Sequence, residues 1–343
     1  MTYFPFETYW WLYAGFLALV AMLLALDLGV FHRKPHAVGF VEAAKWSALW
    51  VGLALAFNVG LVYFAGWALA SDSRFAGTVG FSAQTVATQM GWDFLAGYLV
   101  EKALSLDNIF VFVVIFGYFG IPAVQQHRIL YYGILGAVVM RGALIAAGSA
   151  LLQYEWALIL FGVFLILTGV KMAVLPTKAG GPEDNLLVRW VKAWLPVTPT
   201  LHGDRFLVRM GGVWHATPLL LALAVIEMSD LIFAVDSVPA IFGLTHEPLV
   251  VFTSNVFAIL GLRSLYFLLA EAVQRFQLLK YGLAAILVFV GLKMAWLNGA
   301  MGGKFPATWS LGIIATILAG ATLASMVTSR RAVAIPGATR VRT

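Results

Sequence analysis

Acidic residues recur in pairs inside two long apolar stretches of the chain. Glu101 and Asp107 lie in EKALSLDNIFVF, and Asp230 and Asp236 lie in EMSDLIFAVDSVPAIFGL, so the members of each pair are six residues apart. Carboxylate oxygens bind hard cations such as Mg²⁺, Ca²⁺ and Mn²⁺. A charged side chain near a bilayer centre costs about 2.5–3.5 kcal/mol on insertion scales, so acids placed there indicate a functional site. The repeated arrangement predicts a cation site built from two halves of a transporter.

Further oxygen donors accompany these acids. Asn108 and Ser237 each follow the second acid of a pair, and Glu227 lies one helical turn before Asp230. The predicted metal-binding set is therefore Glu101, Asp107, Asn108, Glu227, Asp230, Asp236 and Ser237. The motifs hold neither cysteine nor histidine, which favours Mn²⁺, Mg²⁺ or Ca²⁺ over Zn²⁺ or Cu⁺. Because carboxylates can exchange a metal for protons, H⁺ exchange is part of the hypothesis.

One regular helix cannot wrap either pair around a single ion. Six residues rotate a helix by about 600° and displace the two acids by about 9 Å. Either the helices unwind, or the ion bridges acids from the two pairs. We favour Asp107 and Asp236 meeting between the halves, with Glu101, Asp230 and Glu227 lining the approach or completing the coordination shell.

Composition predicts a membrane as the setting of these acids. The chain has 343 residues, of which 62% are hydrophobic and 11% are charged, and its mean hydropathy is +0.90. Soluble domains are about 45–50% apolar and about 25% charged, so we expect an integral membrane protein. The absence of cysteine excludes disulfides, thiolate metal sites and thiol redox chemistry. No nucleophile–base constellation, phosphate-binding glycine loop or nucleic-acid-binding module is recognisable, so we expect neither an enzyme nor a partner of nucleic acid.

Nine apolar stretches approach or exceed the roughly 20 residues that a helix needs to cross a bilayer. They lie near residues 10–30, 46–70, 92–118, 129–152, 155–175, 216–244, 249–270, 280–297 and 307–328. The predicted fold is an all-α membrane protein with a single transmembrane domain over residues 1–343. Basic residues concentrate in alternate loops, which places the N-terminus outside and the C-terminus in the cytoplasm. Basic loops at an anionic leaflet also account for the net charge of +6.

Two segments outside the predicted spans are rich in basic residues. Residues 176–215 form the one sizeable loop, which we place in the cytoplasm. Within it, NLLVRWVKAWLP at 185–196 predicts an amphipathic helix on the membrane interface, with docking of a partner as the alternative. Residues 329–343 predict a short, basic, disordered tail.

Four landmarks recur in order along the chain and predict an internal repeat. They are the acid pairs, FGYFGIP at 116–122 with FGLTHEP at 242–248, Arg141 with Arg263, and GVKMA at 169–173 with GLKMA at 291–295. A rival register, which pairs DNIF at 107–110 with DLIF at 230–233, stays open. Each unit holds three predicted spans, so residues 92–175 and 216–297 enter the membrane in opposite directions as an inverted repeat.

The inverted repeat predicts where the site lies. Such architectures place substrate near the midplane between the repeats, often where helices are broken. Pro239, three residues after Asp236, predicts such a break because proline removes a backbone hydrogen-bond donor. We expect Arg141 and Arg263 to compensate the charge of the acids while no ion is bound.

The two acidic motifs resemble the paired signature motifs of the TerC family of integral membrane proteins, which includes the Alx-type transporters. ALDLGVFHRKP at 25–35 and EAAKWSALW at 42–50 are similar to the N-terminal region of that family, and the resemblance covers residues 10–328. It implies a bacterial inner-membrane protein related to the LysE transporter superfamily. The activity that it implies is export of Mn²⁺ from the cytoplasm, with the seven residues above as metal ligands.

The predicted function is therefore secondary-active export of Mn²⁺, which is the transported substrate, with no resident cofactor. One alternative is a Ca²⁺ or broader divalent-cation–proton exchanger. The other is an accessory factor of the secretion machinery that metalates other proteins or helps insert them. The divalent ion and the lipid bilayer are the expected partners, and the accessory role would add proteins of the secretion machinery.

Overall fold

The structure is a computed structural model that describes residues 2–27, 39–78, 80–151, 154–174, 193, 196–270, 278–301 and 305–333. Its helices and strands, in chain order, are α1 (Phe6–Leu26), α2 (Phe40–Ala70), the 3₁₀ turn η2 (Ser73–Phe75), α3 (Ala83–Tyr118), α4 (Ala123–Leu151), α5 (Glu155–Val174), β1 (Leu207–Met210), β2 (Val213–Ala216), α7 (Pro218–Phe242), α8 (Pro248–Leu260), α9 (Leu262–Leu269), α10 (Leu279–Leu292), the π-helical turn η5 (Lys293–Leu297), α11 (Asn298–Ala300) and α12 (Ala307–Val333). Apart from the antiparallel hairpin β1–β2, the described fold is helical.

Within the described residues, seven helical segments are long and apolar enough to cross a membrane, namely α1, α2, α4, α5, α7, the run from α10 to α11, and α12. Helices α8 and α9 meet at a 41° bend and together qualify as one more span. Helix α3, the third of the nine predicted spans, is not among them. Its 36 residues are long enough, but Asp93, Glu101, Lys102 and Asp107 lower its apolar character. The chain is thus a multi-pass α-helical membrane protein, and the part that the structure describes has seven to eight candidate spans.

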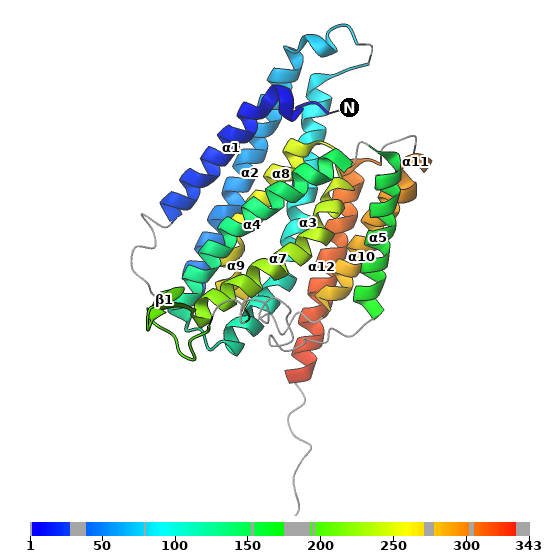
Figure 1. The fold of residues 1–343 in the computed structure, drawn as a ribbon. Helices are drawn as coiled ribbons and strands as arrows, with labels where there is room; N and C mark the ends of the chain where they lie inside the picture. Colours follow the sequence, from blue (N-terminus) through cyan, green and yellow to red (C-terminus); the bar gives the residue numbers. More distant parts are fainter. Residues whose placement is uncertain are drawn as a thin grey trace, which may run out of the picture.

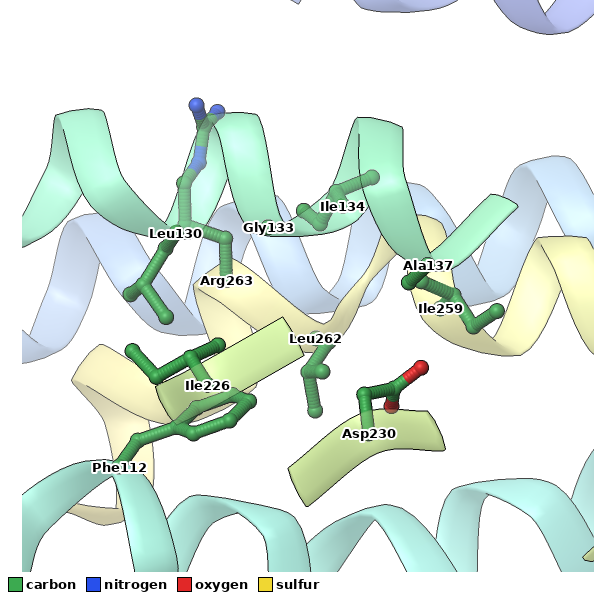
Figure 2. Close-up of a pocket in the computed structure, with 10 residues that line it drawn as sticks. All are labelled: Phe112, Leu130, Gly133, Ile134, Ala137, Ile226, Asp230, Ile259, Leu262 and Arg263. Carbon is green, nitrogen blue, oxygen red and sulfur yellow. The ribbon is translucent and has the colours of Figure 1, made fainter. Parts of the chain in front are cut away.

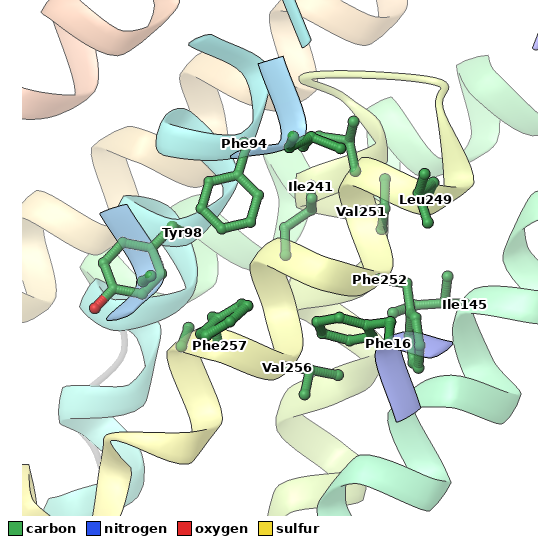
Figure 3. Packing of buried hydrophobic residues seen from close by; sticks show 14 of the residues in the cluster. Phe16, Phe94, Tyr98, Ile145, Ile241, Leu249, Val251, Phe252, Val256 and Phe257 are labelled. Carbon is green, nitrogen blue, oxygen red and sulfur yellow. The ribbon is translucent and has the colours of Figure 1, made fainter. Parts of the chain in front are cut away.

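Helix α8 lies at the centre of the bundle. Every residue from Leu249 to Leu260 is buried, and α8 contacts α1, α2, α3 and α4. A helix that is apolar nearly all round needs neighbours on every side. Figure 3 shows Phe257 of α8 among aromatic rings of other helices, and its ring centroid lies 5.8 Å from that of Phe16 in α1 and 6.3 Å from that of Phe94 in α3. Figure 1 shows α1 and α2 on one side of the bundle and α5, α10 and α12 on the other.

Helices α5 and α10 cross with their backbones in contact. A Cβ atom on Gly291 of α10 would lie 2.6 Å from the carbonyl oxygen of Gly162 in α5. A Cβ atom on Gly169 of α5 would lie 2.7 Å from the carbonyl oxygen of Ala284 in α10. Helices in membranes commonly use such small residues to approach one another, because packing rather than hydrophobicity drives their association.

The predicted helix break at Pro239 is wrong. Helix α7 continues through this residue to Phe242, and the proline removes only its own N–H donor from the hydrogen bonds of the helix. Its carbonyl still accepts a hydrogen bond from the backbone N–H of Gly243 at 2.9 Å. The bend occurs instead at Gly261, between α8 and α9.

The two basic segments also differ from expectation where they are described. Helix α12 continues to Val333, so the segment 329–343 starts as helix, and residues 334–343 lie outside the described part of the chain. The segment 185–196 also lies outside it, except for residues 193 and 196. The hairpin β1–β2, which the sequence analysis did not predict, occupies the end of the 176–215 loop.

Candidate cation-binding site

Arg141 of α4 lies among the predicted acidic residues. Its Nε and Nη2 atoms donate hydrogen bonds to the two carboxylate oxygens of Asp230 in α7, at 3.2 and 2.9 Å. Its Nη1 atom donates to Glu101 of α3 and, at 3.0 Å, to the amide oxygen of Asn255 in α8. One guanidinium therefore connects α4 to α3, α7 and α8.

Neutral side chains complete this set of contacts. Asn108 donates from Nδ2 to Asp230 at 3.2 Å, and Asn255 donates from Nδ2 to Glu101 at 3.4 Å. The hydroxyl oxygen of Ser237 accepts from Nη1 of Arg141 at 3.3 Å. We refer to these residues as the central cluster, which consists of Glu101, Asn108, Arg141, Asp230, Ser237 and Asn255.

Every member of the central cluster is buried. Glu101 is 0% exposed, Arg141 1% and Asp230 4%. Removing an ion from water costs several kcal/mol, so buried charges need compensation from their neighbours. The planar guanidinium supplies it, with a two-point contact to Asp230 and a further donor to Glu101. With both carboxylates ionised, these three groups carry a net charge of −1, which favours a further positive charge.

Two oxygen atoms near Asp230 have no hydrogen-bond partner among the described residues. They are Oδ1 of Asn108 and Oε2 of Glu227, and both are buried. The Glu227 carboxylate packs against Gly136 of α4, where an added Cβ would lie 2.2 Å from a carboxylate oxygen. Buried polar atoms are nearly always satisfied, so each exception asks for an explanation. Oxygen atoms of this kind are ligands that hard cations prefer.

The other predicted acids are placed differently. Asp236 is half-buried, and its carboxylate lies close to Thr168 and Lys171 of α5. The side chain of Asp107 lies outside the described part of the structure. The meeting of Asp107 with Asp236 therefore stays a prediction. The contacts around Arg141 bring together the first acid of each pair, Glu101 and Asp230.

The described side chains include no group of three or more Asp, Glu or His residues that could hold a metal ion. Glu101 and Asp230 both bind the Arg141 guanidinium, which lies where a shared cation would have to lie. The Arg141 guanidinium is thus the positive charge that the two acids share in this structure.

Arg263 of α9 has a different partner from Arg141. It forms a buried ion pair with Asp27 at the end of α1. Arg263 and Asp230 line the same small cavity, and the other residues that line it, among them Leu262 and Ile226, are apolar (Figure 2). The volume of this cavity is about 10 Å³, which is close to the minimum for holding one water molecule. The two charged residues of this cavity thus belong to separate ion pairs, Arg141–Asp230 and Arg263–Asp27.

Asn255 is the member of the central cluster that the sequence analysis missed. It is fully buried and contacts both Glu101 and Arg141. The signal that could have found it is a strongly polar amide within VVFTSNVFAIL at 250–260, an otherwise apolar stretch. An amide at that depth requires a polar partner.

Fold and site together define a class, a multi-pass helical membrane protein with a buried cluster of ion-paired residues. The profile of the family described as "Integral membrane protein TerC family" matches residues 86–333, a range that includes the whole central cluster. The chain belongs to the TerC family, as the resemblance of its motifs predicted. This is a family of integral membrane proteins and not a known family of enzymes.

Bacterial relatives match nearly the whole chain. The "Uncharacterized membrane protein STKORF319" of Myxococcus xanthus is 48% identical over 322 residues, which cover 94% of this chain and 93% of the relative. The "Putative membrane-bound redox modulator Alx" of Photorhabdus laumondii is 47% identical, over 90% of this chain and 92% of its own. The protein of the same name in Escherichia coli (strain K12) is 45% identical, over 90% and 91%. No solved structure matches the chain.

Proposed function

We propose that this protein is a secondary-active exporter of divalent cations in a bacterial inner membrane, with Mn²⁺ as its main substrate. The observation that carries the proposal is the central cluster. Carboxylates from α3 and α7 meet there at one cationic group, and unpartnered oxygens of Asn108 and Glu227 lie beside Asp230. Such an all-oxygen set suits a hard divalent ion. Asp107 and Asp236 would supply further carboxylates along the path.

The contacts between helices support the predicted inverted repeat. In the predicted repeat, α3 corresponds to α7, α4 to α8–α9 and α5 to α10. The contact of α3 with α8 then has the contact of α7 with α4 as its counterpart, and both contacts occur. Individual residues follow the same rule. With an offset of 122 residues between the repeats, Gly162 corresponds to Ala284 and Gly291 corresponds to Gly169. Gly162 contacts Gly291, and Ala284 likewise contacts Gly169. Isologous pairs of this kind are what a twofold relation produces.

The crossings of α3 and α7 favour the register that pairs the acids. Gly97 of α3 lies against Ser254 of α8, and Gly133 of α4 lies against Ile226 of α7. In the register that pairs the first acids and the second acids of the two motifs, the offset is 129 residues. Gly97 then corresponds to Ile226. With the rival offset of 123 residues, Gly97 would correspond to a residue six positions before Ile226, more than one helical turn away from this contact.

On this proposal α3 completes a set of nine spans, and the N-terminus lies outside while the C-terminus lies in the cytoplasm. The central cluster then lies between the repeats, where inverted-repeat transporters bind substrate. The Alx relatives are named as redox modulators, but this chain has no cysteine with which to do thiol chemistry. An effect on cellular redox balance would follow here from the amount of redox-active Mn²⁺ that is exported.

Metal flux through proteoliposomes containing the purified full chain tests the proposal. We expect Mn²⁺ flux from the wild type and a loss of about tenfold or more in Glu101→Gln and Asp230→Asn, since tenfold corresponds to only about 1.4 kcal/mol. Both substitutions preserve side-chain size and remove a charge. The matched control Glu7→Gln changes an exposed acid in the first turn of α1 and should leave flux unchanged.

The same vesicles separate the alternatives. Competition by Ca²⁺, Mg²⁺ and Zn²⁺, with and without a pH gradient, distinguishes an Mn²⁺ exporter from a Ca²⁺ or broader divalent-cation–proton exchanger. Normal flux in both cluster variants would refute the site. Wild-type vesicles that carry no divalent cation would refute the function and favour an accessory role with the secretion machinery.

A further inference from the structure

We propose that Arg141 is a built-in substitute for the transported cation. Its guanidinium occupies the two acids while the carrier is empty and leaves them when a cation binds. This inference rests on the proposed function and deepens it, because it names the group that competes with the substrate and lets the carrier return empty.

The contacts of Arg141 are the contacts that a hard cation would need. Both carboxylate oxygens of Asp230, one oxygen of Glu101, the amide oxygen of Asn255 and the hydroxyl of Ser237 all accept from its N–H groups. A divalent ion bound between the acids would take oxygen atoms of the same kinds. The guanidinium and the metal therefore exclude one another. Because arginine stays protonated in proteins, the guanidinium keeps its positive charge throughout the transport cycle.

Arg141 also joins the two parts of the molecule that have to move. Its acids come one from each predicted repeat, Glu101 from α3 and Asp230 from α7. Alternating access in inverted-repeat transporters moves one repeat against the other around the site. Arg263, the equivalent residue of the second repeat, binds Asp27 of α1 instead. Of the two arginines, only Arg141 binds Glu101 and Asp230, so Arg263 serves as an internal control.

A small cavity lies beside Asp230 on the side to which the guanidinium would withdraw, and it would have to widen, because its volume of about 10 Å³ is close to the minimum for a single water molecule. Side chains on a helix lean towards its N-terminus, so the side chain of Arg141 extends towards the preceding turns of α4. The residues one and two turns earlier are Ala137 and Gly133, and both line the cavity that reaches Asp230 (Figure 2). Because these two residues carry little or no side chain, an arginine moving along this face of α4 would displace side chains of other helices, such as Ile226, and not those of α4 itself.

Occupation by Arg141 has a consequence for transport. With the guanidinium in place, the empty carrier buries compensated carboxylates and can change its access without a bound metal ion. Without it, the empty carrier would bury two uncompensated carboxylates, which is strongly unfavourable. The metal-loaded carrier does not need Arg141 on the acids. Removal of the arginine should therefore stop net transport and spare exchange.

The test compares Arg141→Gln, Arg141→Lys and the control Arg263→Gln as full chains in proteoliposomes. Net Mn²⁺ flux into metal-free vesicles is measured beside exchange of radioactive Mn²⁺ with Mn²⁺ on both sides of the membrane. We expect Arg141→Gln to lose about tenfold or more of net flux while exchange stays within about threefold of wild type. Arg141→Lys should restore part of the net flux, and Arg263→Gln should leave the ratio of the two modes unchanged.

Equilibrium binding of Mn²⁺ is a second readout. Removal of an arginine with a purely structural role would not tighten this binding. If Arg141 occupies the acids in about 90% or more of empty carriers, its removal should tighten Mn²⁺ binding by about tenfold or more. An arginine that only holds helices together would produce weaker binding when removed, and that result would overturn the proposal. Equal losses of net flux and exchange would overturn it as well.

Arg141→Lys keeps the test decisive if Arg141→Gln does not fold. An ammonium lacks the two-point fork of the guanidinium and is a weaker competitor on a carboxylate pair. We therefore expect tighter Mn²⁺ binding and a lower ratio of net flux to exchange in this variant, and weaker binding would contradict the proposal. Wild-type vesicles with no Mn²⁺ flux in either mode would refute the proposed function instead.

Discussion

Replacing Gly291 with alanine should destabilise the protein at the crossing of α5 and α10. The new Cβ would lie 2.6 Å from the carbonyl oxygen of Gly162 and 2.8 Å from the side chain of Ile166. Cβ atoms essentially never come within 3.0 Å of a non-bonded heavy atom. The distance between the new Cβ and the Gly162 oxygen must therefore increase by about 0.4 Å or more. The obstacle is the backbone of α5, so no change of side-chain rotamer relieves it.

The expected cost follows from this geometry. Overpacking of a well-packed contact costs about 1–3 kcal/mol. Alanine favours a helix over glycine by up to about 1 kcal/mol, which offsets part of the cost. Gly60→Ala in α2 is the matched control, because nothing lies within 4 Å of its new Cβ and only the propensity gain applies. The difference between the two variants therefore isolates a packing cost of about 1–3 kcal/mol.

Reversible unfolding by SDS in mixed micelles, followed by tryptophan fluorescence, measures this difference. We expect Gly291→Ala to have a lower free energy of unfolding than Gly60→Ala by that amount. Gly169→Ala should behave like Gly291→Ala, because its Cβ would lie 2.7 Å from the backbone carbonyl oxygen of Ala284 at the same helix crossing. Equal stability of Gly291→Ala and Gly60→Ala would refute the backbone contact on which the reasoning depends.

Two further perturbations concern buried carboxylates. Asp27→Asn should lower the free energy of unfolding by about 3–5 kcal/mol because it leaves Arg263 buried without its counter-charge. The double change Asp27→Leu with Arg263→Met should recover most of that loss, and a double variant as unstable as the single one would contradict the explanation. Glu247→Ala should cost about 1.5–3 kcal/mol, because this carboxylate accepts the backbone N–H groups of Tyr3 and Phe4 at 2.7 and 3.1 Å. Hydrogen exchange at those two amides should accelerate, and unchanged protection there would contradict the role assigned to Glu247.

Much of the fold could be predicted because the signals for membrane helices are local. The predicted spans at 129–152 and 155–175 correspond closely to α4 and α5 of the structure. The bend between α8 and α9 could not be predicted in this way. It occurs at Gly261, where a Cβ atom would lie 2.6 Å from the ammonium nitrogen of Lys102 in α3. A neighbouring helix occupies that space, and no pattern within α8 or α9 encodes its presence.

By itself, the sequence determined that this is a membrane protein, which residues carry charge inside its spans, and that four of the acids form two pairs with the same six-residue spacing. Composition and spacing along one chain are sufficient for those conclusions. The tertiary structure decided that Glu101 and Asp230 share Arg141, while Asp236 turns to α5. Which acids face one another depends on how α3 and α7 are rotated about their own axes. Packing against α4 and α8 sets that rotation, and these contacts join residues 40 and 89 positions apart in the sequence.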